Sequence, residues 1–284
     1  MKTLQKALQG AAVVAAVVAS ASVAKADLTL QGAVGLPLNP TAQIPEQGAV
    51  RVQGNYTELG SSSKLYGLYA AGRVADNIEV NGGIEKLDVS GGYKRSGVAF
   101  GGKYLFTRES DPAGVRLAAG AGYSRAQLNN TYGYVVASKY FGAIANGRVP
   151  ITGHLGLRYD RFDYGLFGAG RSNKLSVYAG AEVPVTRNGN LAVVGELQSK
   201  VVKFSGASAP YSLSVRYRPQ NQGFSASVGL MRRGILSNDS RVFAQLGYTF
   251  GGSVAESEGA VATTATPSPS DTTTTTSSTT TATP

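Results

Sequence analysis

The residues best able to do chemistry in this chain are few, and its single histidine comes first. His154 lies in the stretch TGHLGLRYDRF, and the chain has no cysteine. Nucleophilic catalysis needs a nucleophile beside such a base, and HLGLRY offers no serine. In an extended strand His154 shares a face with Arg158 and Asp160, which favours an interior hydrogen-bond network. We therefore predict no catalytic residue, no metal site and no cofactor; an esterase or lipase that uses His154 is the alternative.

Charged side chains form the second candidate group. The 284 residues include 27 Lys and Arg against 17 Asp and Glu, a formal net charge of +10. No basic run exceeds two residues, which argues against a nucleic-acid partner. The predicted pore-lining residues are Arg51, Lys103, Arg116, Lys139, His154, Arg158, Glu182, Glu196, Arg216 and Arg218. Such a set predicts either a lumen that favours anions or charge pairs that fill a closed interior.

The elements that would position these residues are β-strands. From Gly48 to Phe250 the chain breaks into alternating segments separated by Gly, Asn, Asp, Ser and Pro, as in an all-β barrel or sandwich. Short connections predict an antiparallel up-and-down meander of about twelve strands. The predicted strands are 49–59, 64–74, 77–89, 93–107, 114–126, 131–142, 149–162, 174–185, 190–202, 211–218, 223–233 and 241–250.

The two faces of these segments distinguish a membrane barrel from a soluble sandwich. In 211–218, Leu213 and Val215 alternate with Ser214 and Arg216. Across the segments the second face is rich in Gly, Ala and Ser, which suits a confined inner wall. The lengths match the roughly 9–11 residues of a tilted membrane-spanning strand. We predict a transmembrane antiparallel β-barrel over 48–250; a soluble secreted β protein is the alternative.

Aromatic residues support a membrane barrel. Tyrosines near strand ends predict an interfacial girdle: Tyr56, Tyr66, Tyr104, Tyr123, Tyr132, Tyr140, Tyr159, Tyr211, Tyr217 and Tyr248. The last strand ends on Phe250, which resembles the C-terminal signal of bacterial outer-membrane barrels. Because lipid offers no hydrogen bonds to the backbone, that strand must pair with the first one.

The ends of the chain predict export and two segments outside the barrel. Residues 1–26 combine a basic start, a short apolar run and a small-x-small site, which is typical of a signal peptide. Residues 27–47 contain Pro37, Pro40 and Pro45 and predict a lead-in or plug. Residues 251–284 are rich in Ala, Ser, Thr and Pro and predict a disordered tail. We expect an outer-membrane protein with both termini in the periplasm.

The stretch GLPLNPTAQIPEQGAVRVQGNY resembles the opening of the YjbH-like group of outer-membrane barrels, which is associated with exopolysaccharide. Gly35, Pro40, Thr41, Ala42 and Gly48 carry the likeness. The resemblance covers about twenty residues and implies an outer-membrane barrel with a role near envelope polysaccharide. It assigns no functional residue.

These observations predict a narrow porin-like channel with a mildly basic lumen, or a barrel with a structural role in the envelope. The expected partners are outer-membrane lipid and either small anionic solutes or envelope polysaccharide.

Overall fold

The computed structural model describes residues 27–59, 63–108, 110, 114–125, 128–143, 149–163, 170–186, 188–203, 207–219, 222–235 and 239–251. The predicted signal peptide and all but Gly251 of the predicted tail lie outside the described residues. Within the described ranges, no helix is long and apolar enough to cross a membrane.

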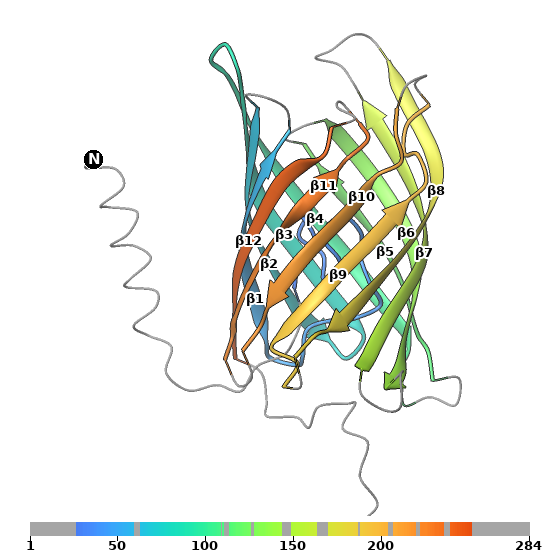
Figure 1. Cartoon of the computed structure of the whole chain (residues 1–284). Helices are drawn as coiled ribbons and strands as arrows, with labels where there is room; N and C mark the ends of the chain where they lie inside the picture. The colour runs from blue at the N-terminus through green and yellow to red at the C-terminus, as the bar shows by residue number, and fades with distance from the viewer. Residues whose placement is uncertain are drawn as a thin grey trace, which may run out of the picture.

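Twelve antiparallel strands of the described chain close into one barrel (Figure 1). Each strand pairs with its sequence neighbours, and β1 pairs with β12 to complete the ring. This confirms the predicted all-β, up-and-down barrel. The strands are β1 (Val50–Glu58), β2 (Lys64–Ala75), β3 (Ile78–Val89), β4 (Tyr93–Thr107), β5 (Arg116–Ser124), β6 (Asn129–Ala143), β7 (Val149–Asp163), β8 (Arg171–Pro184), β9 (Leu191–Gln198), β10 (Tyr211–Tyr217), β11 (Phe224–Arg232) and β12 (Arg241–Phe250).

The ring closes where the sequence predicts it. Phe250 at the end of β12 stands opposite Val50 at the start of β1, and the register continues to Phe243 opposite Thr57. Pairing of the first and last strands leaves neither with an open backbone edge. We call the end of the barrel that holds Val50 and Phe250 the terminal mouth, and the other end the far mouth.

Alternation along β12 shows how the strands divide their side chains. Phe243, Gln245 and Thr249 point inward and are buried, whereas Val242 and Leu246 point outward and are exposed. The period of two is a property of the extended backbone. It therefore assigns the residues of β12 alternately to the lumen and to the outer surface.

Small residues line the inner wall for a steric reason that the sequence alone does not show. Tyr178 of β8 lies over Gly156 of β7, and a Cβ at Gly156 would overlap the tyrosine ring. Tyr134 lies over Gly120 in the same way. Glycines on one strand thus accommodate large aromatic side chains from the next, and these rings fill the lumen.

Residues 27–47, here called the lumen segment, lie inside the ring of strands, where Figure 1 draws them as a blue loop within the barrel. The segment folds on itself: Thr29 N–H donates to Ala33 O at 2.7 Å, and Leu30 N–H donates to Pro37 O at 2.8 Å. Most of its residues are buried. Gly48, with φ of +74°, turns the chain from this segment into β1.

Apolar side chains of the lumen segment pack on apolar wall residues. Leu28 and Val34 pack with Tyr69 and its neighbours, and Leu30 packs with Met231 and Phe243. Much of the apolar core is therefore formed between the segment and the wall.

One strand limit and one girdle position differ clearly from the sequence predictions. The predicted strand 190–202 ends earlier, at Gln198, because Val201 and Val202 leave the sheet and pack against Leu128 and Phe162 at the far mouth. This apolar group, with Ala207 and Ile235, is here called the far-mouth cluster. Tyr132, predicted in the interfacial girdle, is buried in the lumen, because the even-numbered residues of β6 face inward.

Candidate functional site

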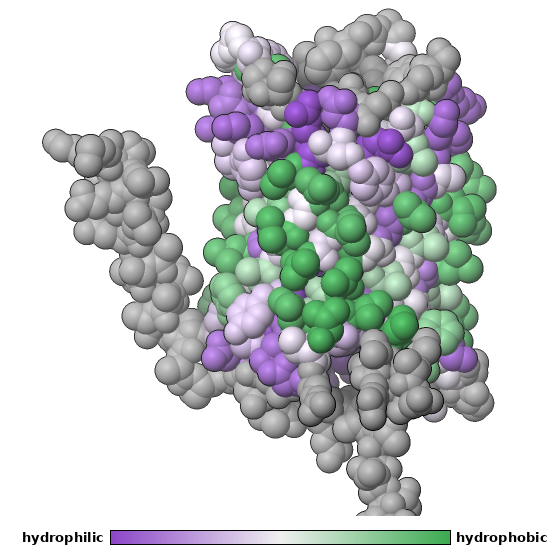
Figure 2. All heavy atoms as spheres, in the orientation of Figure 1, coloured by the Kyte–Doolittle hydropathy of each residue, from purple (hydrophilic) through white to green (hydrophobic). Residues whose placement is uncertain are grey.

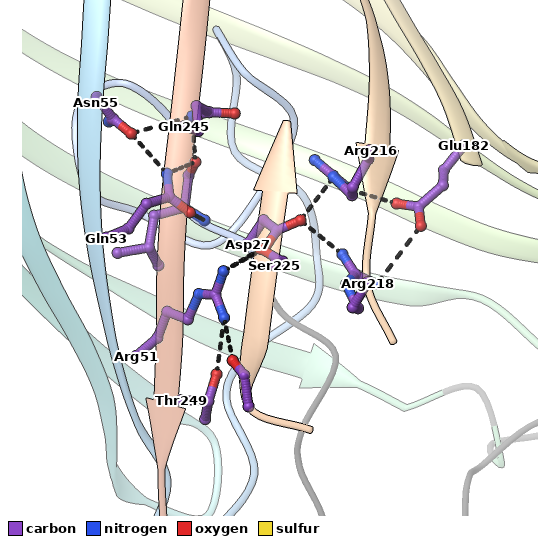
Figure 3. A network of polar contacts seen from close by, with 12 residues as sticks. Asp27, Arg51, Gln53, Asn55, Glu182, Arg216, Arg218, Ser225, Gln245 and Thr249 are labelled. Carbon is purple, nitrogen blue, oxygen red and sulfur yellow. Dashed lines mark hydrogen bonds and ion pairs between the residues drawn. The ribbon is translucent and has the colours of Figure 1, made fainter. Parts of the chain in front are cut away.

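The first group of lumen contacts gathers around Asp27 near the terminal mouth (Figure 3). One carboxylate oxygen of Asp27 lies 2.6 Å from Nη2 of Arg51 and accepts a hydrogen bond from Ser225 Oγ at 2.5 Å. The other oxygen lies 2.6 Å from Nε of Arg216 and 2.8 Å from Nη2 of Arg218. Strands β1, β10 and β11 thus place three donor side chains, and the residue just after β10 places a fourth, around one carboxylate of the lumen segment.

A second carboxylate completes this group. Glu182 Oε2 lies 2.6 Å from Arg216 Nη1, and its Oε1 lies 3.5 Å from Arg218 Nη1. Three guanidinium groups therefore face two carboxylates, a net charge of +1 for the group. Since Asp27 belongs to the lumen segment, the wall alone contributes three positive charges and one negative charge, a net +2.

The arginines hold Asp27 in its ionised form. Burial by itself raises the pKa of the Asp27 carboxyl group, but the charges of Arg218, Arg216 and Arg51 outweigh burial. The resulting pKa lies well below the usual range for aspartate. The carboxylate is therefore ionised at neutral pH.

The second group joins β3 and β4 to the lumen segment. Lys103 Nζ lies 2.8 Å from Glu79 Oε2 and also donates to the backbone oxygens of Val34 and Gln43, at 2.9 and 2.7 Å. Glu79 in turn accepts a hydrogen bond from Val34 N–H at 2.9 Å. Backbone groups of the lumen segment thus form further hydrogen bonds with both members of this wall ion pair.

The third group lies on β7 and β9. Glu196 accepts hydrogen bonds from the Leu38 amide at 2.6 Å and from Asn39 Nδ2 at 3.1 Å. Arg158 pairs with Asp160 at 2.9 Å and donates to Gln31 Oε1 at 2.7 Å. The charged residues of all three groups thus have partners on the lumen segment or on the barrel wall.

His154 lies beside Ser138, which sequence reasoning missed because the two lie on different strands. Ser138 Oγ is 2.8 Å from His154 Nδ1 and accepts a hydrogen bond from Ala42 N–H at 2.9 Å. All three residues are buried, and Ala42 belongs to the lumen segment that covers the pair. The pair is a member of the interior network and is shielded from the lipid-facing surface. Among the described residues, no group of three His, Asp or Glu side chains is arranged to hold a metal ion.

The structure brings most predicted pore-lining residues together. Those buried in the lumen are Arg51, Lys103, His154, Arg158, Glu196 and Arg216. Glu182 and Arg218 are partly exposed near the terminal mouth, and Arg116 is half-buried at the start of β5. Lys139 is the correction: it is exposed and shares the outward face of β6 with Val135, because Ser138 takes the inward position.

Sequence reasoning missed Asp27, which the structure places at the centre of the first group. Its three arginine partners lie 24 to 191 residues away along the chain. Its only sequence signal is its place as the first residue after the predicted cleavage site.

The outer surface decides the class of barrel. Exposed apolar side chains from many strands form a belt, which Figure 2 shows as a green band between more polar ends. Ile84 is 62% exposed, Leu175 60%, Leu197 69% and Leu246 59%. A surface this apolar fits hydrocarbon and not water. The chain is a transmembrane β-barrel.

Comparison with known proteins finds structural similarity only at low sequence identity. No family model and no curated protein match the chain. Among solved structures, a NanC porin has a TM-score of 0.49 and 13% identity, covering 71% of this chain and 99% of its own. A KdgM porin has a TM-score of 0.48 and 11% identity, covering 72% and 99%. An outer-membrane channel from Pseudomonas putida F1 has a TM-score of 0.45 and 11% identity, covering 75% and 100%.

Likeness at this level carries no argument about solute or mechanism. The YjbH-like resemblance stays a prediction, since no family model matches.

Proposed function

We propose that this chain is an outer-membrane, porin-like β-barrel whose own N-terminal segment closes the lumen. The observation that carries the proposal is the set of contacts between the lumen segment and the wall. They reach residues of β1, β3, β4, β6, β7, β8, β9, β10, β11 and β12. A segment held from all these sides lies across the path of any solute.

The space left beside the segment supports closure. A cavity of about 50 Å³ lies between the lumen segment and the far-mouth cluster, bordered by Leu30, Gln31, Arg158 and Val201. That volume accommodates a few water molecules at most. A solute larger than these waters passes this point only if the segment moves.

Movement of the segment would give the lumen an anion preference. Arg51, Arg216 and Arg218 lose the Asp27 carboxylate when the segment leaves, and the wall then carries a net +2 at the terminal mouth. Fixed charge in a narrow lumen selects ions of the opposite sign. The open barrel is thus a narrow channel for small anionic solutes, and a role near envelope polysaccharide stays an expectation from the resemblance.

The test is single-channel recording in planar bilayers. The mature chain is compared with a variant that lacks residues 27–47, and heat-modifiable gel mobility shows whether the variant forms a barrel. We expect a small or intermittent current for the mature chain and a larger, anion-preferring current for the variant. Equal currents for two folded barrels contradict closure by the segment, and no current in either supports a purely structural barrel.

The contact of Ser138 with His154 warrants a test of the enzyme alternative. A catalytic serine must reach its substrate, but both residues lie on the lumen side under Ala42. We expect the barrel to hydrolyse no lipid esters, with the His154→Ala variant as the matched control. Hydrolysis that disappears in this variant would support the esterase alternative.

A further inference from the structure

We infer that Arg51, Arg216 and Arg218 form a binding site for small carboxylate anions, and that Asp27 is its built-in occupant. The inference rests on the proposed function, because an outside anion takes the place of Asp27 only when the lumen segment moves. It adds a site and a ligand class to that function. The segment is then a closing element held by the same chemistry that binds solute.

Asp27 makes as many contacts as a carboxylate can accept. Each carboxylate oxygen receives two: Arg51 and Ser225 on one, Arg216 and Arg218 on the other. A carboxylate has about four acceptor positions, and three hydrogen bonds together with the ion contact of Arg216 Nε at 2.6 Å occupy both oxygens of Asp27. Arginine forks suit planar carboxylates and form strong, charge-assisted hydrogen bonds. The wall thus holds the Asp27 carboxylate as it would hold a bound carboxylate ligand.

The arginines retain unused donors. Within the described part of the chain, four buried nitrogens of these arginines have no hydrogen-bond partner: Arg51 Nε, Arg216 Nε, Arg216 Nη2 and Arg218 Nε. Of these, Arg216 Nε makes only its ion contact with Asp27. Arg51 also contacts Ser225 Oγ and donates to Gly223 O and Thr249 Oγ1, so its other nitrogens are held in place. A rigid group of buried cations with spare donors can accept an anion that has more oxygens than Asp27.

Access to the group comes from one side. The Asp27 and Arg216 side chains are 2% and 3% exposed, but Arg218 is 15% exposed and Glu182 is 19% exposed. Exposure therefore increases toward one side of the group, near the terminal mouth. A small anion from that side meets Arg218 first and then the position of the Asp27 carboxylate.

The test is chemical rescue in the full mature chain. Asp27→Ala removes the carboxylate and leaves room for formate, whereas Asp27→Asn removes the charge and keeps the side chain's volume. We expect Asp27→Ala to unfold at a lower temperature than the wild type in gel-mobility assays. Sodium formate should raise that temperature more than sodium chloride at equal ionic strength. A ligand that binds the folded state and not the unfolded state raises the unfolding temperature in this way.

Two controls assign the effect to the site. Asp27→Asn should show no formate-specific shift, and adding Arg218→Gln to Asp27→Ala should weaken the apparent formate affinity at least about tenfold, as loss of one charge-assisted hydrogen bond predicts. If formate and chloride act alike on folded Asp27→Ala, the inference is overturned. The same holds if Arg218→Gln leaves the formate response unchanged.

A second measurement applies if Asp27→Ala does not fold. Ala42→Cys places a thiol on the lumen segment at a fully buried position of a chain with no other cysteine. Formate should compete with Asp27 and raise the rate of maleimide labelling above the rate in chloride. Equal rates in the two salts contradict the inference.

These results are separable from a failure of the proposed function. A barrel that never conducts but shows formate-specific rescue has the site without the pore. A barrel that conducts after deletion of the segment, with no formate response in either measurement, has the pore without the site.

Discussion

Glu79 and Lys103 stand directly opposite each other on β3 and β4, and their ion pair of 2.8 Å is fully excluded from solvent. Removing one member leaves a buried charge without compensation, which typically costs about 3–5 kcal/mol. We therefore expect Glu79→Gln to lower the free energy of unfolding by about that amount. Urea titration of the barrel in detergent measures the change.

An exposed pair offers the matched control. Arg171 and Asp163 lie 3.6 Å apart, with side chains 68% and 42% exposed. Asp163→Asn should cost less than about 1 kcal/mol, since solvent screens such pairs. If the two substitutions had similar effects, the lumen pair would not be desolvated as the structure describes.

Gly156 is predicted to tolerate no side chain. Gly156→Ala should displace the Tyr178 ring and break its hydrogen bond to Pro40 O, which is 2.9 Å long. Overpacking of this kind costs about 1–3 kcal/mol, and the looser lumen segment should raise maleimide labelling of Ala42→Cys. Gly133→Ala is the control, because its nearest neighbouring atom lies 3.8 Å from the added Cβ. Equal labelling in the two variants would argue against the Tyr178 contact.

The outer apolar belt predicts that the free-energy cost of an outward-facing charge depends on its depth in the membrane. Leu246 lies in the middle of β12 and is 59% exposed, so Leu246→Arg places a charge in hydrocarbon. We expect a loss of about 2–4 kcal/mol in lipid vesicles, against about 0–1 kcal/mol for Thr131→Arg near the end of β6. Equal costs at the two positions would contradict a membrane-spanning orientation.

The low pKa of Asp27 predicts that titration of this carboxyl group does not release the lumen segment in the ordinary pH range. A carboxyl group whose pKa is lowered on folding contributes stability above its unfolded pKa of about 3.9. That contribution is lost only as the pH falls through the folded value. The groups that face Asp27 are Arg51, Arg216, Arg218 and Ser225, and the arginines stay charged over this range.

Maleimide labelling of Ala42→Cys, corrected for the thiolate fraction of a free peptide, should therefore show no change that depends on Asp27 from about pH 8 to about pH 5. Asp27→Asn, which has no carboxylate, should label faster than the parent throughout. A rise on acidification that Asp27→Asn abolishes would show that Asp27 titrates in this range.

Local patterns in the sequence predicted the fold well. The limits of β4 and β12 agree with the predicted ones, and Leu213 and Val215 face outward as expected. Both follow from the alternation of the extended backbone, which needs no knowledge of partners. Lys139 was misplaced because a shift of one residue moves a side chain to the other face of the sheet.

The contacts of the site could not be predicted in the same way. Asp27 meets Arg218 across 191 residues and Glu196 meets Asn39 across 157. No local pattern pairs residues so far apart. The charges of the lumen were identified by residue type, but their compensation by the lumen segment depends on where that segment folds.

The most direct test of closure is to lock and release the lumen segment within one protein. The double variant Ala42→Cys, Ser138→Cys is designed to form a disulfide between the lumen segment and β6. In the structure the Ala42 amide donates to the Ser138 hydroxyl at 2.9 Å, and the chain has no native cysteine. We predict that the oxidised double variant passes no sustained current in a planar bilayer, and that a reductant added to the same membrane restores the gating of the single variants. An equally large steady current before and after reduction would contradict closure by residues 27–47.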